Sequence, residues 1–110
     1  MPSKDACVLL CTAPQGEAET IAATLVDRRL AACVNLIANV QSVYRWEGKV
    51  TSDNECLLII KTTRDMVGRL REELVTMHSY DVPEVLSLDV NDGHMPYLDW
   101  IRSSVGSEKE

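Results

Sequence analysis

The stretch from residue 32 to residue 46 constrains most strongly what this chain can fold into. It is rich in β-branched and aromatic residues and has no helical period, which predicts a strand. Glu47-Gly48-Lys49 follows as a turn signal, and residues 55–63, centred on Cys-Leu-Leu-Ile-Ile, predict a second strand. Together the two strands indicate a long β-hairpin.

The length of this hairpin exceeds what one domain can cover. A straight strand of fifteen residues spans roughly 50 Å, whereas a domain of 110 residues has a diameter of roughly 35 Å. The far half therefore either kinks back onto its own core or projects into solvent. We expect projection and a closed homo-oligomer, because exposed aromatic strands aggregate unless a partner covers them. The predicted contacts between copies are Val43, Tyr44 and Trp46.

The remaining segments predict an α+β fold. The apolar run at residues 6–12 predicts a buried strand, and helical spacing of apolar residues predicts helices at 15–30 and 63–78, with Thr63 as N-cap. A fourth strand is predicted at 84–90, and a last helix begins at Pro96. The order β-α-β-β-α-β plus a C-terminal helix is typical of the split βαβ, ferredoxin-like arrangement.

Charge and hydropathy exclude several classes of partner. The net charge of −6, from 17 acidic and 11 basic side chains, disfavours binding to nucleic acid or to anionic membranes. No apolar run approaches the roughly 20 residues of a membrane helix, and no signal-peptide pattern opens the chain. We therefore expect a cytoplasmic protein that makes no membrane contact. Its four cysteines, without any Cys-x-x-Cys pair, are expected to be reduced and mostly buried.

The motifs do not predict an enzyme. The sequence contains no glycine-rich phosphate loop, no Gly-x-Ser-x-Gly elbow and no His-Glu-x-x-His helix. Four residues beside the buried strands are candidates for a polar cleft between subunits, where small molecules often bind, although structural ion pairs explain the charged ones equally well. These residues are Cys33, Glu55, Lys61 and Glu84.

A metal site is better founded, and the predicted topology supplies the reason. The end of the first strand and the end of the second helix meet at one edge of a split βαβ domain, which places Cys11 near Met77 and His78. Thiol, thioether and imidazole form a soft ligand set suited to copper. The structural alternative stays open, because cysteines and helix-stripe methionines are commonly core residues and a histidine is favoured at a helix C-terminus.

Several motifs together resemble the CutA divalent-cation tolerance proteins, over about residues 6–102. The motifs are Cys11-Thr12, Leu30-Ala31-Ala32-Cys33-Val34-Asn35, Ser42-Val43-Tyr44-Arg45-Trp46-Glu47-Gly48-Lys49, Lys61-Thr62-Thr63, His78-Ser79-Tyr80 with Pro83-Glu84, and Tyr97-Leu98-Asp99-Trp100. The resemblance implies one CutA-like domain over residues 1–110, with an ordered core at about 6–105, assembled as a homotrimer.

For function, the resemblance implies a cytoplasmic homotrimer that binds copper or another divalent metal ion and contributes to metal tolerance. The fold and assembly also resemble those of PII signalling proteins, so the alternative is a sensor or scaffold that holds a metabolite or an unidentified protein partner between subunits. In copper-binding members the resemblance assigns ligands to the strand-one cysteine, here Cys11, and to a histidine pair ending the second helix. This chain keeps the second histidine as His78 but has Met77 at the first position, and has Ala38 where the family often has a strand-bending proline.

Overall fold

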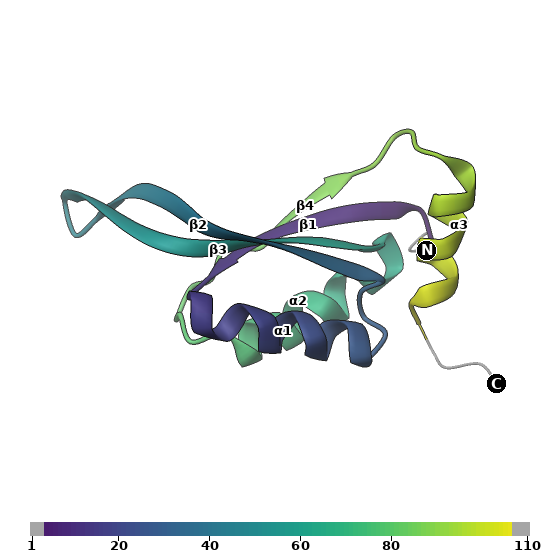
Figure 1. The fold of residues 1–110 in the computed structure, drawn as a ribbon, viewed down its shortest axis with the longest axis horizontal. Coiled ribbons are helices and arrows are strands. Elements are labelled where there is room, and N and C mark those ends of the chain that lie inside the picture. Colours follow the sequence, from purple (N-terminus) through teal and green to yellow (C-terminus); the bar gives the residue numbers. More distant parts are fainter. Residues whose placement is uncertain (1–3, 107–110) are drawn as a thin grey trace.

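A computed structural model describes residues 4–106 of the chain (Figure 1). No helix within those residues is long and apolar enough to cross a lipid bilayer. The elements, in chain order, are β1 (Ala6–Ala13), α1 (Gln15–Asp27), β2 (Cys33–Trp46), β3 (Lys49–Thr63), the 3₁₀ turn η1 (Arg64–Met66), α2 (Val67–Met77), β4 (Leu86–Asp89) and α3 (Met95–Ser104).

The four strands form one antiparallel sheet in the order β2-β3-β1-β4. Helices α1 and α2 lie side by side on one face of the sheet, and α3 lies at the end where β1 begins (Figure 1). This is the ferredoxin-like α+β arrangement that the order of elements predicts.

The core lies between the sheet and helices α1 and α2. Alternate side chains of β1 point to this side, so Leu9 and Cys11 are fully buried. Leu58 and Ile60 of β3 and Leu74 of α2 are likewise fully buried and belong to the same apolar cluster. Each buried leucine contributes about 1.5–3 kcal/mol of transfer free energy, so this cluster is what holds the sheet to its helices.

Helix α1 ends at Asp27, three residues before the predicted end at residue 30. The cause is Arg29, whose positive φ of 60° is incompatible with a continuing helix. Its guanidinium donates hydrogen bonds to the carbonyls of Ser103 and Gly106, near the other end of the chain. The backbone N–H of Leu30 donates to the Leu25 carbonyl, so the chain turns out of the helix at Arg29, whose side chain also ties this turn to the end of α3.

The predicted N-cap of the second helix is wrong. The Thr63 hydroxyl donates to the Asp65 carboxylate rather than capping the helix, and a 3₁₀ turn precedes α2. Helix α2 begins at Val67 and ends at Met77, so the predicted range 63–78 is too long. Strand β4 covers Leu86–Asp89 and is shorter than the predicted 84–90.

The β2–β3 ribbon projects beyond the helices, as Figure 1 shows at the left. The molecule measures 49 Å along its longest axis against 27 and 26 Å along the others. Val43 is 65% exposed and Trp46 is 62% exposed, while Tyr44 is 39% exposed. The kinked strand that folds back onto its own core is therefore wrong. Strand β3 begins at Lys49, so the ribbon is longer than the sequence pattern of residues 55–63 indicates.

A β-bulge divides the ribbon into an inner half that lies over the helices and an outer half that projects. The register of β2 against β3 shifts between Ile37 and Val40. Asn39 adopts a positive φ of 61°, and its backbone N–H donates to the side-chain oxygen of Gln15 at 3.0 Å. The bulge bends and twists the strand beside Ala38, so no proline is needed to redirect the ribbon.

The sheet face opposite the helices is apolar and uncovered within this chain. Leu86 and Leu88 of β4 are 54% and 49% exposed, and they pair with Leu10 and Val8 of β1. Ile37 of β2 is 45% exposed. An apolar sheet face of this kind is unusual on a monomer.

Candidate functional site

The end of β1 and the end of α2 meet at one edge of the sheet, as the topology predicts. His78 directly follows α2, and its Nε2 lies 2.8 Å from the carbonyl oxygen of Thr12. Thr12 is the neighbour of Cys11 on β1. The structure thus brings two of the predicted metal ligands, Cys11 and His78, to the same place.

Both ring nitrogens of His78 are engaged in hydrogen bonds. The Thr12 carbonyl can only accept, so Nε2 carries the proton. The Tyr80 backbone N–H can only donate, and it lies 3.1 Å from Nδ1, which must therefore offer its lone pair. The His78 residue is buried, with 7% exposure, and both of its ring nitrogens are hydrogen-bonded in this conformation.

Cys11 is a fully buried thiol. Burial raises its pKa to about 12, and the negative charges of Glu84 and Glu55 act in the same direction. The thiolate is the form that binds metals, so the proton must leave before Cys11 can act as a ligand. This environment keeps Cys11 protonated in the closed structure.

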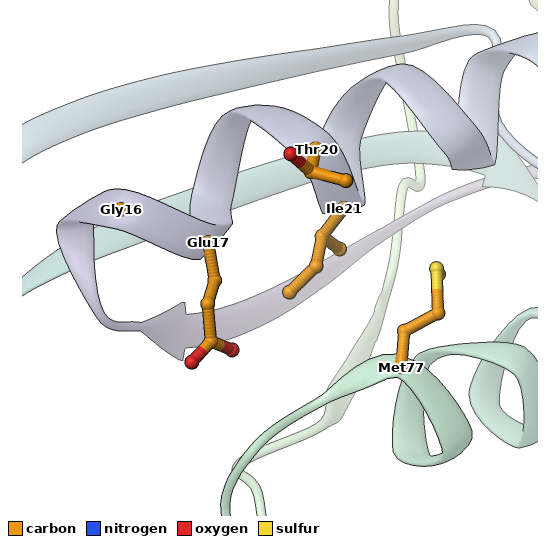
Figure 2. A pocket seen from close by; sticks show the side chains of 5 residues that line it. All are labelled: Gly16, Glu17, Thr20, Ile21 and Met77. Atoms are coloured by element: carbon orange, nitrogen blue, oxygen red, sulfur yellow. The ribbon is translucent and has the colours of Figure 1, made fainter.

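Met77 points away from the sheet edge, into the groove between the two helices. Figure 2 shows its side chain rising from the end of α2 toward Ile21 and Thr20 of α1. These residues line a shallow cavity of about 290 Å³ together with Gly16 and Glu17. Met77 is therefore a partly buried neighbour of the core, consistent with the helix-stripe alternative.

Tyr80 is the functional candidate that the residue patterns did not single out as a site residue. Its ring lies against the His78 ring, with centroids 4.5 Å apart, and its hydroxyl donates to the Glu55 carboxylate at 2.7 Å. Burial and this carboxylate both raise the pKa of the Tyr80 hydroxyl, so it stays protonated as a donor. The signal in the sequence was the motif His78-Ser79-Tyr80, which supported the resemblance without indicating a role.

The four candidate cleft residues fall into two groups. Lys61 donates to the Asn35 side chain, and its Nζ lies 4.0 Å from the Cys33 sulfur. The charges of Glu55 and Glu84 act instead on Cys11, whose pKa they raise. Strand register sets the separation, because Cys33 pairs with Lys61 whereas Cys11 pairs with Leu58. A single cleft that contains all four residues stays a prediction.

The end of β1 and the residue after α2 bring a thiol and an imidazole to one sheet edge. Among residues 4–106, no three His, Cys, Asp or Glu side chains are grouped so that they could hold a metal ion. Cys11 and His78 suit a soft ion by chemistry, but both are occupied by protons or hydrogen bonds. Binding at these residues stays a prediction, and it requires the loop after α2 to open.

Comparison with known proteins finds that the chain is similar to CutA proteins. The family model described as CutA1 divalent ion tolerance protein matches residues 7–104. The chain is 46% identical over 100 residues to the divalent-cation tolerance protein CutA of Thermus thermophilus, covering 90% of this chain and 97% of that protein. It is 44% identical to the chloroplastic protein CutA 1 of rice, covering 88% of this chain but about half (55%) of that longer protein.

Solved structures agree with this comparison. The crystal structure of CutA from Xylella fastidiosa superposes with a TM-score of 0.91 at 36% identity, and covers 93% of this chain and 99% of that one. The Thermus thermophilus structure gives a TM-score of 0.89 at 44% identity, with 92% and 99% covered. Fold and sequence therefore point to the same family.

Proposed function

Because the chain belongs to the CutA1 divalent ion tolerance family, we propose that it is a cytoplasmic homotrimer that binds copper or another divalent metal ion and contributes to metal tolerance. The family match over residues 7–104 carries this proposal. The family is named for ion tolerance and not for a reaction, and we assign no catalytic role to any residue.

Two surfaces of the fold support the trimer. The outer half of the ribbon exposes Val43, Tyr44 and Trp46, and the sheet face opposite the helices is apolar. A ring of identical copies covers both surfaces at once, since each ribbon extends past its own body toward a neighbour. Sedimentation velocity at micromolar concentration checks the proposal. A trimer mass is the expected result, and a stable monomer would overturn it.

For the metal, the sheet edge at Cys11 and His78 is the proposed binding place. Thiol and imidazole donors suit Cu(I), and Met77 directly precedes His78 in the chain, so a thioether is available if its side chain turns from the cavity. The protein's part is to present a thiolate and an imidazole nitrogen to the ion. A bound ion would be removed from solution, which is how binding would contribute to tolerance.

Titration of Cu(I) and Cu(II) against variants tests the metal proposal. The informative variant is Cys11→Ser. Its matched control is Cys7→Ser, which changes a second buried thiol on the same strand and the same face. We expect Cys11→Ser to lose tight Cu(I) binding and Cys7→Ser to retain it. Equal stoichiometry in all three proteins would remove Cys11 as a ligand.

A second candidate function rests on the cluster of Lys61, Asn35 and Cys33. A charged amine on an otherwise apolar sheet face is a candidate contact for a small metabolite between subunits, as in a PII-like sensor. Thermal-shift screening of nucleotides and small carboxylates tests it, with Lys61→Met as the variant and Lys49→Met at the tip of the ribbon as control. A stabilisation that persists in Lys61→Met would exclude this cluster.

A further inference from the structure

We propose that Tyr80, held in place by Glu55, is a latch that controls access to the imidazole of His78. The inference rests on the proposed metal-binding function and deepens it. It concerns the residues that decide whether the sheet edge is open or closed, which the predicted ligand set does not include.

The first step of the argument is the position of the Tyr80 backbone. Its N–H occupies the only lone pair of His78, at Nδ1, while Nε2–H is committed to Thr12. An incoming metal ion needs that lone pair, so Tyr80 must move before His78 can bind anything. Since Tyr80 lies only two residues along the chain from His78, a change in the local backbone is sufficient.

The second step is what holds Tyr80 there. Residues 78–85 contain no helix or strand, so side-chain contacts must anchor them. The Tyr80 hydroxyl donates a hydrogen bond to the Glu55 carboxylate, and Glu55 is a buried residue with only 7% exposure. The Ser79 N–H adds a longer contact of 3.3 Å to Glu17. The Tyr80–Glu55 bond is the short one, and its acceptor is a buried carboxylate.

The third step is energetic. Glu55 loses the Tyr80 hydroxyl as a hydrogen-bond donor if Tyr80 swings out, and an unsatisfied buried carboxylate is unfavourable. The closed state is therefore favoured until a ligand that binds only the open state shifts the balance. Weakening the Tyr80–Glu55 bond should raise the population of the open state and the apparent affinity for a ligand by the same factor.

The experiment measures the freed imidazole directly, in metal-free protein. Diethyl pyrocarbonate acylates an unprotonated imidazole nitrogen, and peptide mass spectrometry reports each histidine separately. His94, an exposed residue at the start of α3, is the internal control. Wild type should show His78 reacting much more slowly than His94. Equal rates would overturn the latch.

Four variants separate the latch from a general loosening of the fold. Tyr80→Phe removes the donor and Glu55→Ala removes the acceptor, and both should speed His78 acylation by about tenfold to a hundredfold, the range for a hydrogen bond to a charged group. Glu55→Gln keeps an acceptor oxygen but loses the charge, so its acylation rate should fall between those of wild type and Glu55→Ala. Tyr97→Phe removes the hydroxyl of a 42% exposed tyrosine on α3, away from the latch, and should have no effect.

The same proteins are then titrated with Cu(I) against a competing chelator. Tighter binding by Tyr80→Phe and Glu55→Ala, by the factor seen in acylation, supports the latch and the metal function together. Faster acylation with no Cu(I) binding in any variant supports the latch and overturns the metal function. Unchanged acylation and affinity in both variants would overturn the latch, whether or not wild type binds copper.

Discussion

The inner and outer halves of the β2–β3 ribbon are made by the same two strands and yet lie in opposite environments. In the inner half, Leu58 and Ile60 are fully buried against α1 and α2. In the outer half, Val43, Trp46 and Val50 are 65%, 62% and 72% exposed. The inner half of β3 is the more apolar, with Cys-Leu-Leu-Ile-Ile against Lys-Val-Thr-Ser-Asp-Asn in the outer half. The outer half nevertheless carries these three large apolar side chains where none of the chain's own helices covers them.

This difference shows that contacts within one chain stabilise the inner half of the ribbon, whereas the outer half can be stabilised only by contacts with another molecule. Hydrophobic burial acts in proportion to the apolar area that leaves the water. The inner half gains that term when a single chain folds. The outer half gains it only when another surface covers the ribbon, which is why the proposed trimer and the fold are physically linked.

The largest expected effect contrasts one residue from each half of β3. Leu58→Ala should lower the free energy of unfolding by about 2–5 kcal/mol, because it leaves a cavity in the packed core. Val50→Ala should lower the stability of the single folded chain by less than about 1 kcal/mol, because that side chain is 72% exposed there. Urea unfolding at one fixed protein concentration gives both values. A loss in Val50→Ala as large as that in Leu58→Ala would show that the outer half is packed in solution.

The next effect concerns assembly. Val43→Lys places a charge in the predicted contact between copies and should weaken the trimer by about 1–3 kcal/mol per subunit, the cost of burying a polar group without a partner. Val26→Lys is the control, because Val26 is 42% exposed on α1, away from the ribbon. Sedimentation at several concentrations reports the change. A trimer that dissociates equally in both variants would break the link between the outer half and assembly.

The boundary between the halves gives a smaller effect. Asn39 has a φ of 61°, a region that costs a β-branched residue about 1–2 kcal/mol. Asn39→Val should therefore destabilise the protein by about that amount, while Asn39→Gly should be close to neutral or better. Urea unfolding again supplies the comparison. If valine were as stable as glycine at this position, the bulge would not be fixed by that backbone conformation.

The sequence predicts that the outer half of the ribbon projects, because this follows from the length of one strand. A strand-like stretch at residues 32–46 is longer than the domain that carries it, whatever its contacts. The bulge was not predictable in the same way. Neither glycine nor proline marks it, and the side chain that contacts Asn39 is Gln15, far back in the sequence. Long-range contacts of this kind leave no local pattern.

The candidate site, too, has one part that the sequence predicts and one part that it does not. Topology alone placed Cys11 beside the end of α2, because strand and helix directions fix which ends meet. The closed state of His78 depends on a backbone carbonyl, that of Thr12, and a backbone N–H, that of Tyr80. Almost every residue has a backbone carbonyl and a backbone N–H, so no side-chain motif predicts which of these groups will form hydrogen bonds with the ring nitrogens of His78.

The smallest expected effect tests the inner end of the ribbon, where β3 passes into η1. Asp65 is partly buried there, and burial alone would raise its pKa. Hydrogen bonds from Thr63 and Lys4 outweigh burial and hold the pKa below its ordinary value of 3.8. The folded state therefore binds the proton less readily than the unfolded state, and Asp65 contributes stability at neutral pH.

That contribution is present above the unfolded pKa and disappears as the pH falls through the folded one. Asp65→Asn should be slightly less stable than wild type at pH 7, and the difference should shrink to nothing between about pH 5 and about pH 2. Thermal unfolding of both proteins across this range gives the measurement. A difference that stayed constant with pH would mean that the carboxylate's charge contributes nothing at this end of the ribbon, and that the inner half depends on apolar burial alone.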